Sequence, residues 1–109
     1  MANATYWQRG EAIDFTNGTG SKIEANEIVV LGSHVGVAGS DIAAGETGSL
    51  HVFGVFEMPK KASEAISAGT DVYWSSDGIT ATAGANPKAG YAIGAAIATD
   101  ETIKVKLLG

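Results

Sequence analysis

Glycine interrupts this chain so often that long regular elements are excluded. The 109 residues include 15 glycines, spread over most of the length. Glycine supplies the positive φ values that tight turns need, so this spacing favours short strands joined by turns. We therefore expect an all-β protein, and the length predicts one domain with a modest core.

Alternation of polar and apolar residues predicts the individual strands. It is clearest at residues 102–107, where threonine and lysine alternate with isoleucine, valine and leucine, as in a half-buried strand. Residues 49–58 alternate in the same way around Gly54, where a bend is expected, and Pro59 ends the run. Further strands are expected at residues 12–16, 27–31, 34–38, 72–74, 79–82 and 91–98, with a loop at 75–78 closing a hairpin.

Two segments could be mistaken for helix. Residues 91–98 are rich in alanine, but Gly90 and Gly94 would each weaken a helix by about 1 kcal/mol, so a strand is preferred. Residues 62–67 are expected to form one helical turn at most.

A short pattern, Ile-x-Ala-Gly/Asn, occurs at residues 23–26, 42–45 and 66–69, each time ahead of an expected strand. Glycine and asparagine tolerate left-handed backbone geometry, so the pattern predicts one type of turn used three times, with its isoleucine in the core. The unequal spacing gives no sign of a solenoid or a duplicated domain. About eight short strands with frequent turns predict a small single-domain β-barrel or sandwich.

Charge and composition limit the kinds of partner that this protein can be expected to bind. Twelve acidic residues against seven basic ones give a net charge of −5, which disfavours nucleic acid. The absence of cysteine excludes disulfides and thiolate metal sites. The N-terminus does not resemble a signal peptide and no apolar run is long enough to span a bilayer, so we expect a soluble chain without a membrane partner.

Residues suited to catalysis do not form a recognisable set. The two histidines, His34 and His51, would need carboxylates such as Asp14 or Asp41 nearby to hold zinc, and no spacing indicates this. Ser33 lies beside His34, but neighbours on a strand point to opposite faces, so a serine triad is disfavoured. We therefore expect no catalytic residue, no metal and no enzyme activity.

The glycine-rich segments do not match the known phosphate-binding loops. Residues 18–22 lack the residue order of a P-loop, and residues 32–39 lack the spacing of a dinucleotide-binding loop. No cofactor is expected.

The first nine residues differ from the rest, because they are polar and small apart from two aromatic side chains. We expect residues 1–9 to form an N-terminal arm and residues 10–109 a single barrel-like domain. Tyr6 and Trp7 either close the barrel as a hydrophobic staple or anchor a partner. Together with Arg9 they are the candidate contact residues.

Several motifs resemble the capsid cement, or decoration, proteins of tailed bacteriophages. The resemblance begins with the run VAGSDIAAGETGSL at residues 37–50 and GVFEMPK at 54–60. It continues in the same order over nearly the whole chain, at residues 10–14, 69–74, 90–93 and 103–107. Some members of that family are labelled as putative phage recombinases, but the missing P-loop and the acidic charge argue against ATP-dependent strand exchange here.

The resemblance implies a structural role on a virus particle. A protein of this family is expected to be made in the bacterial host cytoplasm and to bind the major capsid protein on the outer surface of the expanded head. There, as a dimer or trimer, it would reinforce the shell against the pressure of packaged DNA through many repeated contacts. Tyr6, Trp7 and Arg9 would then contact the capsid or a neighbouring subunit.

Two other classes of protein stay open at this point. A carbohydrate-binding β module would need an exposed aromatic platform, for which Tyr6–Trp7 or Tyr73–Trp74 are the candidates. A small β-barrel enzyme would need a cleft containing Asp14, Asp41 or His51.

Overall fold

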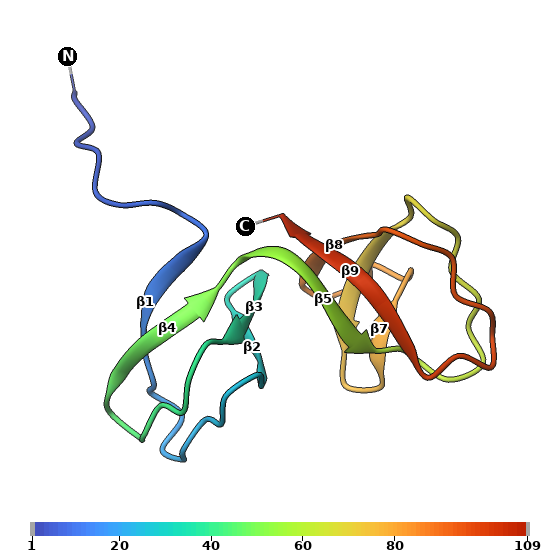
Figure 1. Cartoon of the computed structure of the whole chain (residues 1–109), viewed down its shortest axis with the longest axis horizontal. Coiled ribbons are helices and arrows are strands. Elements are labelled where there is room, and N and C mark those ends of the chain that lie inside the picture. The colour runs from blue at the N-terminus through green and yellow to red at the C-terminus, as the bar shows by residue number, and fades with distance from the viewer. Residues whose placement is uncertain (1, 109) are drawn as a thin grey trace.

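Nine short strands form one continuous sheet in the computed structural model, which describes residues 2–108 (Figure 1). Every regular element in this range is a strand, so the all-β expectation is confirmed. No helix that is long and apolar enough to cross a membrane occurs within residues 2–108. The strands are β1 (Ala12–Thr16), β2 (Ile28–Leu31), β3 (His34–Ala38), β4 (Thr47–His51), β5 (Phe53–Pro59), β6 (Asp71–Ser75), β7 (Gly78–Thr80), β8 (Lys88–Ala92) and β9 (Thr102–Leu108).

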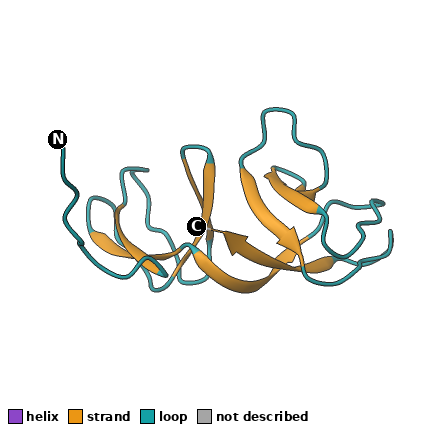
Figure 2. Cartoon of the chain, turned by 90° about the horizontal axis from the view of Figure 1, so that it is seen from above, coloured by secondary structure: helices purple, strands orange, loops and turns teal. Residues whose placement is uncertain are grey.

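The sheet follows the path β1-β4-β3-β8-β6-β7, with β2 paired to β3 and β5 paired to β9. All pairs are antiparallel except β3–β8, which meet in parallel where His34 faces Lys88. Seen from above, the strands make a wide, shallow, open layer with the N-terminus at one end (Figure 2). The β3–β8 contact is the place where two parts of the sheet join.

These two parts are halves with the same strand plan. In the first half β1 pairs with β4, β2 with β3, and β3 with β4; in the second, β5 pairs with β9, β6 with β8, and β8 with β9. Each half contributes its own hydrophobic cluster, the second one extended by Val35 and Val37 from β3. The insertion of β7 and its following loop between β6 and β8 lengthens the second half. Because the first half has no such insertion, the turn pattern recurs at unequal intervals, and the sequence does not indicate that the two halves share one strand plan.

Matching hydrogen bonds support the correspondence between the halves. Ile23 and Ile42 exchange two backbone bonds of 2.9 and 2.7 Å, and Ile66 and Ala96 exchange two of 2.9 and 2.8 Å. A second pair of bonds also recurs, Asn26 N–H to Ala38 O with Ala38 N–H to Glu27 O, and Gly69 N–H to Ala92 O with Ala92 N–H to Thr70 O. The same local fold is therefore built twice from different residues.

The predicted turn occurs at all three places where its pattern was found. The residue at the fourth position of the pattern has positive φ each time, 71° at Asn26 and 80° at both Gly45 and Gly69, and the isoleucine at the first position is buried. A fourth turn follows Ala96 in the second half, where Thr99 takes that position, so the sequence pattern did not reveal it. The closing bonds run from Glu27 N–H to Glu24 O, Glu46 to Ala43, Thr70 to Ser67 and Asp100 to Ile97.

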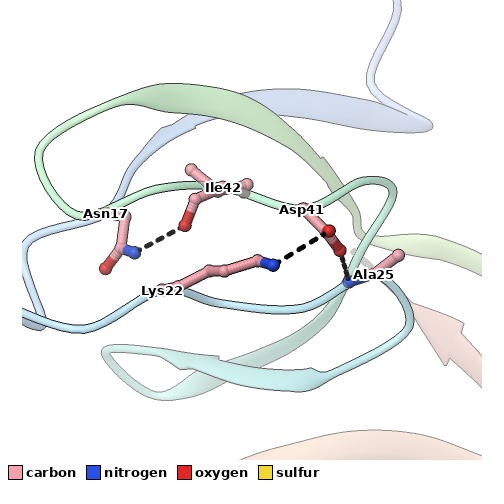
Figure 3. A network of polar contacts seen from close by, with 5 residues as sticks. All are labelled: Asn17, Lys22, Ala25, Asp41 and Ile42. Atoms are coloured by element: carbon pink, nitrogen blue, oxygen red, sulfur yellow. Dashed lines mark hydrogen bonds and ion pairs between the residues drawn. The ribbon is translucent and has the colours of Figure 1, made fainter.

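Polar side chains tie the turns of the first half together (Figure 3). Asn17 is fully buried and donates its Nδ2 to the carbonyl of Ile42 at 2.9 Å. The Asp41 carboxylate accepts the backbone N–H of Ala25 at 2.8 Å and lies 3.3 Å from the ammonium of Lys22. The bond from Ala25, followed by the contact with Lys22, lowers the pKa of Asp41.

Lys60 occupies in the second half the position that Asn17 has in the first. Its ammonium is buried and donates to the carbonyls of Lys61 at 2.9 Å, Ala98 at 3.5 Å and Glu64, which lies four residues further along the chain. Asn17 likewise donates to the carbonyl four residues ahead of it. One amide and one ammonium group therefore organise equivalent loops.

Replacing Lys60 by methionine is expected to lower the free energy of unfolding by about 2 kcal/mol, because the loop carbonyls lose their shared donor while the apolar stem is kept. Chemical denaturation followed by circular dichroism measures the change. Lys61→Met, at the exposed neighbouring position, is the matched control and should change stability little. Unchanged or higher stability in Lys60→Met would mean that burying the ammonium costs more than its hydrogen bonds return.

The run at residues 49–58 is two strands, and the expectation of one strand bent at Gly54 is wrong. β4 ends at His51 and β5 begins at Phe53, with Val52 between them. Leu50 packs in the cluster of the first half and Met58 in that of the second. The chain thus crosses between the halves inside a run that looks continuous.

Two further local expectations need correction. The strand expected at residues 91–98 ends at Ala92, and the following segment is a loop in which Ile97 is 64% exposed. Residues 62–67 form no helical turn; they hold a turn at Ala62 and Ser63, where Ser63 has a φ of 63°. The antiparallel backbone bridge between Ile66 and Ala96 joins the two segments, and their local sequence does not indicate this pairing.

Candidate functional site

The N-terminal segment carries the most exposed aromatic side chains of the described chain. Tyr6 is 81% exposed and Trp7 85%, and Arg9 beside them is also exposed. The hydrogen bonds found among residues 2–108 begin at Glu11, whose carbonyl accepts the N–H of Val52 at 3.0 Å. In Figure 1 the segment extends away from both halves. Tyr6 and Trp7 therefore do not act as a staple that closes the fold.

An apolar groove lies between the two halves. It has a volume of about 500 Å³ and is lined by Ile28 and Val37 from the first half and by Phe56, Met58 and Trp74 from the second. Ile28, Phe56 and Trp74 are only half-buried, so apolar surface faces the groove from both sides. Exposed residues also line it, namely Asn26, Glu27, Glu57 and Pro59.

A second apolar area lies on the outer face of β5 and β9. Phe53 and Leu108 are cross-strand partners, and both are about half exposed, as is Val55. The ammonium of Lys106 lies over this strip, 4.9 Å from the ring centre of Phe53 and 5.9 Å from that of Tyr91. Exposed aromatic and apolar side chains grouped in this way are typical of protein contacts.

The aromatic pair Tyr73–Trp74 does not form a flat platform. Trp74 lines the groove between the halves, whereas Tyr73 lines a separate hollow beside Ser33, His34 and Asn86. Neighbouring residues on a strand point to opposite faces, so one sugar ring cannot stack on both. This arrangement weakens the carbohydrate-binding interpretation.

The candidate catalytic side chains are spread over three strands and a turn, although Ser33 and His34 line one hollow together. Ser33 is in the turn that joins β2 to β3, and His34 begins β3, both exposed. His51 is in β4, where its ring centre lies 6.2 Å from that of Phe56. Asp14 pairs with Ser49 in the β1–β4 register. Among the side chains of residues 2–108, no three metal-ligating groups gather closely enough to hold an ion.

Glu64 has a perturbed pKa with a structural cause. Burial alone raises the pKa of its carboxyl, but the backbone N–H of Ala81 at 2.7 Å, the hydroxyl of Thr80 at 2.8 Å and the charges of Lys61 and Lys60 outweigh this, and the net pKa is lowered. A carboxylate with a lowered pKa is a weak general base near neutral pH. Glu64 therefore serves to tie its loop to the end of β7.

Comparison with known proteins identifies the family. A family model described as phage cement protein matches residues 7–107, which include both halves of the sheet as well as Trp7 and Arg9. No curated protein and no solved structure matches the chain. Because the match covers nearly the whole length, it confirms the resemblance found in the motifs, and the chain belongs to the phage cement protein family.

Proposed function

We propose that this protein binds the outer surface of the expanded phage head, on the major capsid protein, and stabilises the shell against the pressure of packaged DNA. The family match over residues 7–107 carries this proposal, since membership of a cement family makes the chain a component of the virion capsid. The chain acts by binding and performs no catalysis. It is made in the host cytoplasm and joins the head after expansion.

Reinforcement follows from selective binding. A protein that binds the expanded lattice and not the unexpanded one stabilises the expanded state by mass action. Each copy needs only a modest contact, because many copies around the shell resist rupture together. The net charge of −5 keeps a surface that displays many copies soluble and keeps the chain away from the DNA inside.

The contact residues in this proposal are Tyr6, Trp7 and Arg9. Residues 1–9 act as an arm outside the domain formed by residues 10–109, and the arm meets the capsid or a neighbouring subunit of a dimer or trimer. The exposure of both aromatic rings supports this role, because aromatic side chains that become buried on binding dominate interface energies.

Heat-induced DNA release tests the proposal. Full heads stripped of the protein and then reloaded are heated while an intercalating dye reports released DNA, and reloaded heads should release it at a higher temperature. Unexpanded precursor shells should bind no protein. Identical release curves at saturating occupancy would contradict the proposal, and binding on a glycan array would then bring the carbohydrate-binding module forward.

A further inference from the structure

We propose that the arm of one copy docks in the groove between the halves of a second copy, with Trp7 in the apolar groove and Arg9 paired with Glu27. The inference rests on the proposed function for its setting, a shell that holds many copies side by side. The contact itself is a property of the free chain.

The groove has the chemistry to hold an aromatic side chain. Its volume of about 500 Å³ falls in the range of roughly 300–1,000 Å³ typical of ligand sites. Trp74 and Phe56 present ring surfaces to it, and aromatic rings attract one another beyond the area they bury. An indole that enters the groove would cover apolar surface contributed by both halves.

The charges around the groove favour the arm as the segment that binds there. Glu27 is exposed where it lines the groove, and the ion pairs found among residues 2–108 do not involve it. Arg9 is the single arginine of the chain and the one basic side chain of the arm. A guanidinium group binds carboxylates through two parallel hydrogen bonds, which favours arginine for such a site.

The spacing within the arm fits both interactions at once. In an extended segment, residues two apart point to the same side, about 7 Å from each other. Trp7 and Arg9 are two residues apart in the sequence, so in an extended arm the guanidinium would lie beside Glu27 when the indole is in the groove. Tyr6 and Gln8 then face away from the groove.

A second copy is the source of the arm in this proposal. In the structure the arm of the same chain extends away from both halves and leaves its aromatic rings exposed (Figure 1). The body, residues 10–109, is acidic, with twelve carboxylate residues against six lysines, whereas the arm has one arginine and no carboxylate side chain. Exchange of arms between copies brings these opposite charges together and links neighbours along the shell.

Nuclear magnetic resonance on mixtures of full-length chains tests the contact without phage heads. An isotope-labelled acceptor with Trp7→Ser keeps its groove but has a weakened arm. An unlabelled donor with Glu27→Lys keeps its arm but has an altered groove, so the favoured contact is that of the donor arm with the acceptor groove. At concentrations up to about 1 mM, which reach millimolar dissociation constants, the donor should shift the acceptor signals of Ile28, Phe56 and the Trp74 indole.

Control donors separate the two parts of the contact. A donor that also carries Trp7→Ser should cause no shift in the groove signals. A donor with Arg9→Glu should bind the acceptor at least about tenfold more weakly, and its binding should recover when the acceptor carries Glu27→Lys. Non-specific binding of the arm would not be restored by exchanging the charges of the two partners.

Three outcomes would overturn the inference. Groove signals that do not move, or that move equally with the Trp7→Ser donor, exclude the groove as the docking site. Shifts confined to Phe53, Val55 and Leu108 assign the contact to the outer strip instead. A Trp74 signal that differs between the intact chain and Trp7→Ser at every concentration places the arm in its own groove. Each result is independent of whether the protein protects heads from DNA release.

Discussion

Replacement of Gly90 by alanine is expected to lower the free energy of unfolding by more than about 4 kcal/mol, among the largest effects of single substitutions. An added Cβ would lie 1.8 Å from the carbonyl oxygen of Lys106 and 2.8 Å from its carbonyl carbon. Both atoms belong to the backbone of β9, which pairs with β8 at this position, so the clash can be relieved only by moving one strand away from the other. Because domains of this size are stable by only about 5–15 kcal/mol, this loss would remove a large share of the total stability.

Two glycines serve as graded controls for this substitution. The Cβ added by Gly94→Ala would lie in open space, so this variant should unfold at the same denaturant concentration as the unchanged protein. Gly36→Ala, at the equivalent position of β3, meets the side chain of Leu50 at 2.7 Å and the carbonyl oxygen of His51 at 3.0 Å, and should lie between the two. Equal stability of Gly90→Ala and Gly94→Ala would show that β8 and β9 do not approach each other as described.

Deletion of residues 1–9 is expected to leave folding unchanged and to weaken binding to expanded heads by about a hundredfold. The described part of the arm makes no hydrogen bond to the body, so its loss removes no support from the sheet. Loss of an aromatic anchor and a paired arginine typically costs several kcal/mol of binding energy, at about 1.4 kcal/mol for each factor of ten. Occupancy of stripped heads over a titration measures the affinity, and thermal unfolding measures the stability.

A shorter deletion separates the anchors from the rest of the arm. Removal of residues 1–4 keeps Tyr6, Trp7 and Arg9 and should bind heads as the full chain does. Full binding by the chain that lacks residues 1–9 would exclude the arm as a contact. The outer strip of Phe53, Val55 and Leu108 would then be the surface to test on the capsid.

Some elements could be predicted because their cause is local. β9 alternates polar and apolar residues over residues 102–107, and its buried positions in the structure are those the alternation predicts. The turns at residues 23–26, 42–45 and 66–69 were predicted because positive φ is a property of one residue, and the sequence places asparagine or glycine there. The exposed aromatic pair was likewise visible as large apolar side chains within a polar segment.

The site was only partly open to prediction. Tyr6, Trp7 and Arg9 stood out in the sequence, but the groove did not. Ile28, Phe56 and Trp74 lie far apart in the chain and look like ordinary core residues of three strands. Only the packing of one half beside the other leaves them half-buried along a common groove.

The sequence by itself determined the strand-and-turn character of this protein, because alternation and glycine placement act over a few neighbouring residues. Only the tertiary structure decided where the chain crosses between the halves at Val52, and that Asn17 and Lys60 do the same work. It alone also decided that Gly90 cannot be replaced. These features depend on hydrogen bonds and close approaches between residues distant in the chain. An amide and an ammonium can satisfy equivalent carbonyls without any similarity that a sequence comparison would detect.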